Sequence, residues 1–465
     1  MSSLTTTTTT KKRLFATVTT CRRRHYSFVH HAPLIDQQQQ QPYCANVDVD
    51  DHFYRNKILD EYVQQRTTPI TLRQLLFYER HMNTERLLIS ANYVRKELPI
   101  RISHRIREFQ KLPFIVGTNP HIQQVYDLYW RAFERLRKVP PIKTLADNDA
   151  YCKTLVESLE QHLVVIPRLA LGISECGEHM GSDRIDRFMQ ATLRSRISRR
   201  VLAEQHLALS QQYHHRQHDH HAARTISSIR SHQVMDDNNN VVGGSAAAAV
   251  FSSCSARDTV AQCASLLAQK YSFSPTLELD GDEHVVFTYH SDHIKYIIYQ
   301  LLSNAFRHTI QAHQHTSSSS SSSSLLPPIR VTICSNENDV LFRISDQGGG
   351  IPSDVYRHIW SYGHLPRFNT LRTLPQLAAR IAELKNDQFI GAPPLGIGLP
   401  MSRVYAEYWG GDMNVVSMPG WGTDAYVRIP RFGTQNENLD ICSPYDNEDQ
   451  RPIHLPHSPP RRLVV

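Results

Sequence analysis

The sequence predicts a fold of class α + α/β, an N-terminal antiparallel helix bundle followed by a mixed sheet covered by helices. From about residue 58 to 213, apolar positions recur at spacings of three and four among few glycines, a pattern typical of amphipathic helices. From 256 to 432, short apolar strands alternate with helices. Glycine-rich turns at 346–350, 396–400 and 420–423 separate these elements.

The first half carries the signals of several long helices. Apolar spacing recurs at Leu72, Leu75, Leu76 and Tyr78, and then at Val125, Leu128, Tyr129, Ala132, Phe133 and Leu136. We expect helix ends at Pro99, Pro113, Pro120 and Pro140-Pro141, because proline breaks a helix or begins the next one. Short connections between long helices predict an antiparallel bundle.

The second half reads as helices alternating with strands. We expect helices near 256–271, 291–313 and 400–409, and strands at 276–280, 285–290, 331–334, 340–345, 413–417 and 424–429. The segment 351–395, too long for an ordinary connection, is interpreted as a lid over a functional site. The serine run 317–324 is predicted to be a surface loop.

Biased segments set the predicted boundaries. We predict a transit peptide at 1–35, a disordered linker at 36–57, the bundle at 58–213, a low-complexity linker at 214–255, the sheet domain at 256–432 and a disordered tail at 433–465. The 214–255 segment begins with the histidines 214, 215, 218, 220 and 221. A metal site is the alternative there, but neighbouring homopolymers favour a solvated linker.

Composition excludes several classes of protein. The 465 residues include 40% hydrophobic ones but no run of about 18 apolar residues, so we expect no membrane span. The formal charge is +7, yet the basic residues are not interleaved with aromatic ones, which argues against nucleic-acid binding. The eight cysteines form no CxxC pair, so neither a zinc site nor a disulfide framework is indicated.

Residues 1–35 have the composition of a mitochondrial leader. They contain no Asp or Glu, many Ser and Thr, and basic residues that include Lys11, Lys12 and Arg22 to Arg24. A secretory signal needs an apolar core, which this segment lacks. The arrangement around Arg24 resembles a matrix-processing site; a disordered basic tail is the alternative.

Four scattered motifs predict a nucleotide site. The helix 291–313 places Gln300, Asn304 and Arg307 on one face, where an amide oxygen can bind Mg²⁺ near phosphates. An ordinary amphipathic helix with a solvated polar face is the alternative. Asp346 ends a strand, and its carboxylate can accept from an adenine amino group, while Gly348 and Gly350 allow the base to approach. A simple β-turn is the alternative.

The remaining motifs complete this site. The turn formed by Gly396, Ile397, Gly398 and Leu399 precedes a helix, whose first N–H groups suit phosphate oxygens. Thr423 offers a hydroxyl on the adenine side. In order and spacing, these motifs resemble the N, G1, G2 and G3 boxes of the ATPase fold shared by gyrase, a chaperone, histidine kinases and mitochondrial 2-oxoacid dehydrogenase kinases.

The resemblance narrows outside the ATP site. The phrases at 97–120, 195–209 and 396–429 resemble the mitochondrial pyruvate and branched-chain 2-oxoacid dehydrogenase kinases, over roughly residues 65–430. The first phrase is nearer to the branched-chain member. Which of the two complexes would be the target stays open.

This resemblance implies a matrix kinase that uses ATP and Mg²⁺ to phosphorylate a serine on the decarboxylase α-subunit of a dehydrogenase complex, and thereby inactivates it. It implies Asn304 as the Mg²⁺ ligand, docking of the bundle on a lipoyl domain of the acyltransferase, and a homodimer. It also implies an allosteric 2-oxoacid pocket at His162, Arg196 and Arg200; ordinary salt bridges are the alternative for the two arginines.

The chain departs from the family at three positions in the site. The family's general base, a glutamate, is Gln300 here, the family's lysine is Ser303, and the first glycine of its GxGxG motif is Pro394. Positioned acid–base help typically contributes about 10² to 10⁴ in rate. Two outcomes remain, a kinase that relies on positioning, with His293 as a possible substitute base, or an inactive ATP-binding regulatory partner. An ATPase without a protein substrate is disfavoured, because relatives use the same missing carboxylate.

Overall fold

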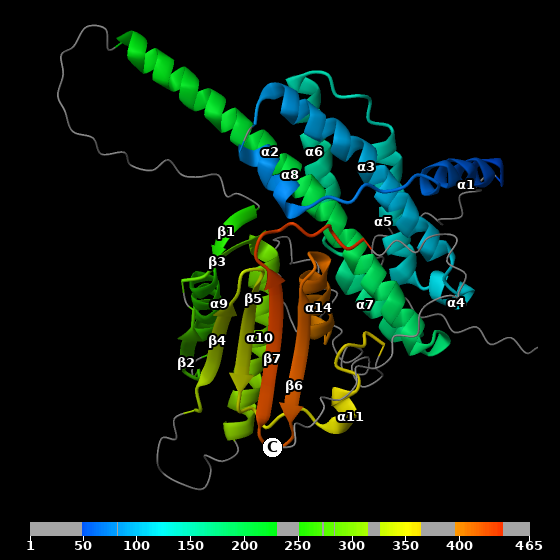
Figure 1. The fold of residues 1–465 in the computed structure, drawn as a ribbon. Helices are drawn as coiled ribbons and strands as arrows, with labels where there is room; N and C mark the ends of the chain where they lie inside the picture. The colour runs from blue at the N-terminus through cyan, green and yellow to red at the C-terminus, as the bar shows by residue number, and fades with distance from the viewer. Residues whose placement is uncertain are drawn as a thin grey trace, which may run out of the picture. The chain divides into compact units, whose positions relative to one another are not determined.

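The computed structural model describes residues 49–80, 82–229, 251–271, 274–282, 284–314, 326–363 and 396–439 (Figure 1). The chain divides into two compact units, Met1–His52 and Phe53–Val465, and the fold below concerns the second. The predicted transit peptide, the serine run, Pro394, most of the predicted lid and tail, and half of the predicted low-complexity linker lie outside the described residues.

The first part of this unit is helical, as predicted. Its helices are α1 (Val49–Val63), α2 (Leu72–Arg80), α3 (Thr84–Gln110), α4 (Phe114–Gly117), α5 (Pro120–Arg137), α6 (Leu145–Gln161), α7 (Val165–Cys176), the 3-10 turn η1 (Gly177–His179) and α8 (Ser182–Ile229). Side-chain caps begin three of them: Asn83 caps α3, Asn119 caps α5, and Thr144 with Asp147 forms a capping box on α6.

The helices pack through aromatic side chains. Helix α3 lies along α5 and α8, and Phe109 of α3 contacts Tyr129 of α5 and Phe188 of α8, with ring centroids 5.5 and 5.1 Å apart. Phe133 of α5 is fully buried and meets Tyr62 edge to face. These contacts form one continuous apolar core.

Three of the four helix boundaries predicted from proline are confirmed. Helices end before Pro113, Pro120 and Pro140, and Pro120 opens α5. The prediction at Pro99 was wrong, because α3 runs through it for 27 residues. Buried residues on both sides of Pro99 hold the helix in place, and this packing offsets the lost hydrogen bond.

The second part is a mixed sheet, which confirms the predicted fold class. Its five strands lie in the order β2 (Leu277–Gly281), β4 (Ile329–Ser335), β5 (Asp339–Asp346), β7 (Gly422–Pro430) and β6 (Asp412–Met418). Strand β2 is parallel to β4 and the other pairs are antiparallel. A separate antiparallel pair joins β1 (Phe251–Ser255) to β3 (Val286–His290).

The sheet is covered by helices on one face. Helices α9 (Ala256–Lys270), α10 (Ser291–Gln314) and α14 (Gly398–Tyr408) lie together behind the strands in Figure 1, and α11 (Ser353–Tyr356) follows β5. Helix α10 packs on α9, α14 and β5, and α14 also packs on α8. None of the described helices is both long and apolar enough to cross a bilayer.

The structure differs from three predicted boundaries. Helix α1 begins at Val49, inside the predicted 36–57 linker. The backbone of α8 stays helical to Ile229, and β1 begins at 251, so the predicted 214–255 linker is structured at both ends. Residues 433–439 of the predicted tail lie against helices, and Glu437 is only 4% exposed.

Replacing Phe133 with alanine tests the packing of the bundle. The side chain is fully buried between Tyr62 and Trp130, so we expect Phe133→Ala to lower the free energy of unfolding by about 3–5 kcal/mol. Phe114, 84% exposed, supplies the control, and Phe114→Ala should change stability by less than about 0.5 kcal/mol. Equal losses in urea unfolding would contradict the described core.

Candidate nucleotide-binding site

One cavity gathers residues from all four predicted motifs. It has a volume of about 660 Å³ and lies among α10, β5, the β6–β7 pair and the start of α14. Its walls include Gln300 and every predicted ATP-binding residue: Asn304, Arg307, Asp346, Gly348, Gly350, Gly396, Ile397, Gly398, Leu399 and Thr423. Residues as far apart in the sequence as Gln300 and Thr423 therefore face one space.

Strand pairing creates one end of this cavity. In the antiparallel register of β5 and β7, Asp346 lies opposite Thr423. The backbones come so close that a Cβ on Gly422 would lie 1.9 Å from the Asp346 carbonyl oxygen, so only glycine fits at that position. The register thus brings the carboxylate and the hydroxyl side by side.

The Asp346 carboxylate is held in place by its own turn. Its Oδ1 accepts the Gly348 N–H at 2.8 Å. Burial raises the pKa of the Asp346 carboxyl, and backbone hydrogen bonds from Gly348 and Thr423 oppose part of this shift. A partly buried carboxylate at the wall of a cavity suits a ligand that donates hydrogen bonds, such as an adenine amino group.

The turn after Asp346 requires glycine. Gly349 and Gly350 have φ of 83° and 72°, in the left-handed region. A Cβ on Gly350 would lie 2.1 Å from the Met418 carbonyl oxygen, and one on Gly348 would lie 2.8 Å from Cβ of His308. The turn therefore packs closely against β6 and α10 and leaves the cavity open beside it.

Helices α10 and α14 form the other end. Arg307 donates to the Asn304 Oδ1 at 3.3 Å, so the two predicted ligands share one face of α10. The Gln300 side chain lies against the first turn of α14, where its Oε1 would be 2.8 Å from a Cβ on Gly398. No side chain caps α14 at Ile397, which leaves its first N–H groups for an anion.

The position of His293 gives no support to its role as a substitute base. It does not line this cavity, although it lies on the same helix as Gln300. Its ring stacks on His290 with centroids 3.9 Å apart and lies 4.6 Å from the Tyr405 ring. Burial lowers the pKa of both imidazoles; the charge of Arg200 adds to this shift for His290, and His290 followed by Arg200 adds to it for His293. Among the described residues, this buried and stacked ring therefore lies outside the lining of the cavity.

Sequence reasoning missed several residues that line the cavity. They are Lys270 and Tyr271 at the end of α9, and Tyr296, Tyr299 and His308 on α10. Tyr296 could have been found, because it precedes Gln300 by four residues and so shares its face. Lys270 and Tyr271 carried no such signal, since only the packing of α9 on α10 brings them there.

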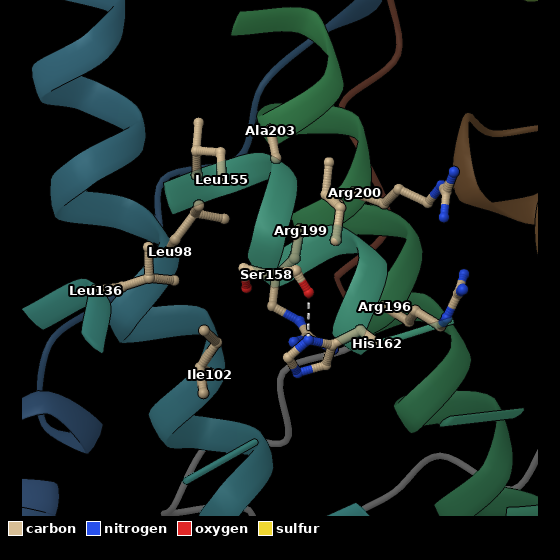
Figure 2. Close-up of a pocket in the computed structure, with 11 residues that line it drawn as sticks. Leu98, Ile102, Leu136, Leu155, Ser158, His162, Arg196, Arg199, Arg200 and Ala203 are labelled. Atoms are coloured by element: carbon tan, nitrogen blue, oxygen red, sulfur yellow. Dashed lines mark hydrogen bonds between the residues drawn. The ribbon is translucent and has the colours of Figure 1, made fainter. Parts of the chain in front are cut away.

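A second, smaller cavity brings together the three residues predicted for an anion pocket. His162, Arg196 and Arg200 line a space of about 40 Å³, together with Arg199 and apolar side chains from α3, α5 and α6. Figure 2 shows the side chains of Arg196 and Arg200 extending to the same side, away from Leu98, Leu136 and Leu155. The added arginine makes the lining more basic than the sequence predicted.

Burial and neighbouring charges shift the pKa values of the basic residues that line this second cavity. The Nδ1 of His162 lies 2.6 Å from the Ser158 carbonyl oxygen, and burial with nearby Arg199 lowers the pKa of His162 to about 3. Burial and Arg200 lower the pKa of Arg196. Arg200 pairs with Glu204 at 2.6 Å, the kind of salt bridge expected under the alternative interpretation. A bound anion would reduce the repulsion among the arginines.

The fold and its cavity define the class of protein, an ATPase domain attached to a helix bundle. Residues 289–432 match the sequence pattern of the histidine kinase-, DNA gyrase B- and HSP90-like ATPases. Residues 69–230 match that of mitochondrial branched-chain alpha-ketoacid dehydrogenase kinase.

Individual relatives agree over most of the chain. Mitochondrial [pyruvate dehydrogenase (acetyl-transferring)] kinase 2 of Saccharomyces cerevisiae is 27% identical, over 84% of this chain and 87% of its own. The corresponding kinase of Arabidopsis thaliana is 29% identical over 80% and 93%. The two sequence patterns and these relatives together support the mitochondrial 2-oxoacid dehydrogenase kinase family for this chain.

A solved catalytic domain, that of the histidine kinase ThkA, is also similar in part. The match covers 39% of this chain and 97% of that one, with 15% identity and a TM-score of 0.26. A score this low adds nothing to the assignment, which the sequence comparisons carry.

The buried imidazole of the second cavity predicts a pH dependence. His162 has a pKa of about 3 in the folded protein and an ordinary value of 6.5, so below pH 6.5 the unfolded chain binds more protons and folding becomes less favourable. From pH 7 to pH 5, this residue should cost about 2 kcal/mol of stability.

Urea unfolding at the two pH values measures this cost. We expect His162→Gln to reduce the pH-dependent loss by that amount, whereas the exposed neighbour variant Gln161→Ala should keep the whole of it. An unchanged pH dependence in His162→Gln would show that this imidazole is not buried.

Proposed function

We propose that this protein is a mitochondrial ATP-dependent protein serine kinase that phosphorylates the decarboxylase α-subunit of a 2-oxoacid dehydrogenase complex and thereby inactivates it. The convergence of Asn304, Asp346, Gly398 and Thr423 on one cavity, in a chain of this family, carries the proposal. The named relatives act on pyruvate dehydrogenase, whereas the bundle matches the branched-chain kinase, so both complexes are candidate targets.

In this proposal each side chain has a separate task. The Asp346 carboxylate accepts the adenine amino group, and Thr423 stands beside it. The N–H groups at the start of α14, from Gly396 to Leu399, surround the phosphates. Asn304 would hold Mg²⁺ through Oδ1, and the ion would supply charge stabilisation for phosphoryl transfer. Arg307, next to Asn304, adds positive charge on the same face.

The neutral Gln300 sets the expected rate. It occupies the base position and lies against Gly398, so it can orient a serine hydroxyl but cannot take its proton. Phosphoryl transfer depends mainly on positioning and on charge stabilisation, which the other residues supply. The proposal is therefore a slow kinase, and the second candidate, favoured by the same amide, is an ATP-binding regulatory partner without activity.

Partners and location follow from the family. We propose that the bundle docks on a lipoyl domain of the acyltransferase, that the chain forms a homodimer and that it acts in the mitochondrial matrix. We propose that the predicted ATP-binding domain, residues 256–432, also includes β1, which begins at residue 251. We also propose that the cavity of His162, Arg196 and Arg200 binds a 2-oxoacid carboxylate.

Phosphate transfer to purified dehydrogenase complex tests the main proposal. With ATP and Mg²⁺, the wild type should label the α-subunit slowly, and Gln300→Glu should raise the rate by about 10² or more, because it restores a base. Gln300→Asn, which shortens the amide, should not raise it. Incubating pyruvate and branched-chain complexes in parallel identifies the target. No labelling by the wild type, together with recovery in Gln300→Glu, would establish the regulatory partner instead.

Titration with 2-oxoacids tests the second cavity. Arg196 and Arg200 can bind one carboxylate, so we expect a branched 2-oxoacid to raise the melting temperature of the wild type. Arg200→Met should weaken this binding by about tenfold or more, while Arg135→Met, at an exposed salt bridge, should not. Equal binding by both variants would contradict the proposal.

A further inference from the structure

The segment that follows the last strand packs against the helical part of the chain. After β7, residues 433–439, here called the strap, run along the segment that leads into α2. The Arg73 N–H donates to the Gly433 carbonyl oxygen at 3.0 Å, Thr71 bridges Asn436, and the Glu437 N–H donates to the Ile70 carbonyl oxygen at 3.0 Å. In Figure 1 the red end of the described chain crosses from the sheet to the helices.

Glu437 is the centre of the strap. Both oxygens of its carboxylate accept hydrogen bonds from the Arg101 guanidinium of α3. Oε1 lies 2.6 Å from one terminal nitrogen and Oε2 lies 2.9 Å from the other. The Ile70 N–H also donates to Oε1 at 3.1 Å. Both charged side chains are almost fully buried, so this is a bidentate pair shielded from water.

The Arg101 guanidinium uses all its donors within the protein. Besides Glu437, it donates to Glu97 at 3.1 Å, to the Thr68 carbonyl oxygen at 2.9 Å and to the Ser198 hydroxyl of α8. A guanidinium carries five N–H donors, and the five hydrogen bonds of Arg101 account for them. Because a buried ion pair is tolerated only with such complete pairing, loss of Glu437 would remove two of the five hydrogen bonds and leave Glu97 as the carboxylate beside the buried guanidinium.

The strap also holds the far end of α14. The Tyr408 hydroxyl donates to Oε2 of Glu437, and the Asn438 N–H donates to the Tyr408 carbonyl oxygen at 2.8 Å. Tyr408 is the last residue of α14, and Gly398, at the other end of these 11 residues, lines the nucleotide cavity. An α-helix this short moves as a rigid body, so the strap fixes where its first N–H groups point.

We propose that Glu437 is a positioning residue for nucleotide binding: it anchors the C-terminal end of α14 to α3 and α8, and thereby sets the phosphate cradle at the N-terminal end. The inference rests on the proposed ATP binding. Two different parts of the fold position the two ends of the nucleotide. The β5–β7 register positions the residues for adenine, and α14 positions the N–H groups for the phosphates. Loosening the strap therefore weakens contacts with phosphates and spares those with adenine.

Nucleotide titration of Glu437→Gln tests this separation. The amide still accepts hydrogen bonds but cannot neutralise Arg101. We expect the Kd for ATP to rise by about tenfold and the Kd for adenosine, which lacks phosphates, to change by less than about twofold. Tyr408→Phe, which removes one hydroxyl between α14 and the strap, should shift the same ratio in the same direction and by less. All titrations are done at a temperature below the melting temperature of every variant.

A matched control separates positioning from general stability. Leu87 is buried in a small cluster with Leu209 and Tyr213, away from α14. Leu87→Ala should lower the melting temperature and leave the ratio of ATP to adenosine affinity unchanged.

Each further outcome decides the question. If Glu437→Gln and Tyr408→Phe lower the melting temperature but keep the wild-type ratio, the strap is only structural and the inference is overturned. If Glu437→Gln does not fold, Tyr408→Phe alone gives the decision. If the wild type binds adenosine but gains nothing from phosphates, the phosphate cradle is absent and the inference falls. If the wild type binds neither ligand, the proposed function itself fails.

Discussion

The pairing of β5 with β7 is the constraint on which the nucleotide cavity depends. It puts Asp346 opposite Thr423, and it requires glycine at position 422 because the two backbones nearly touch there. After Asp346 the chain turns at Gly349 and Gly350, and their positive φ angles allow the turn to pack against β6. A shift of one residue in this register would turn Asp346 to the other face of the sheet and remove it from the cavity.

The helical part and the sheet part are joined by buried polar contacts. The Arg101–Glu437 pair ties α3 to the strap, and Arg194 of α8 pairs with Glu407 of α14 at 2.8 Å. Asp186 of α8 accepts the Tyr362 N–H at 2.7 Å, within the first residues of the predicted lid. Because buried charges are costly without partners, these contacts allow few alternative arrangements of the two parts. Helix α8 lines the second cavity and packs on α14, whose first turn lines the nucleotide cavity.

Local patterns predicted most of the fold and site, and long-range contacts account for what they missed. The strands and helices from 256 onward follow the predicted ranges closely, since each has a clear period and a turn at its ends. Helix α3 continues through Pro99 because its packing outweighs the tendency of proline to end a helix. Glu437 could not be predicted, because its only signal is a partner 336 residues away. His293 shares a helix with Gln300, but packing against His290 and Tyr405 removes it from the cavity.

The central claim is that this chain keeps a nucleotide cradle while it lacks the base. A crystal structure with Mg²⁺ and a non-hydrolysable ATP analogue tests this directly. The account predicts the adenine amino group within hydrogen-bond distance of the Asp346 carboxylate, the metal on Oδ1 of Asn304 and the phosphates at the first turn of α14. A nucleotide bound elsewhere, or a cavity that stays empty at millimolar analogue, would contradict it.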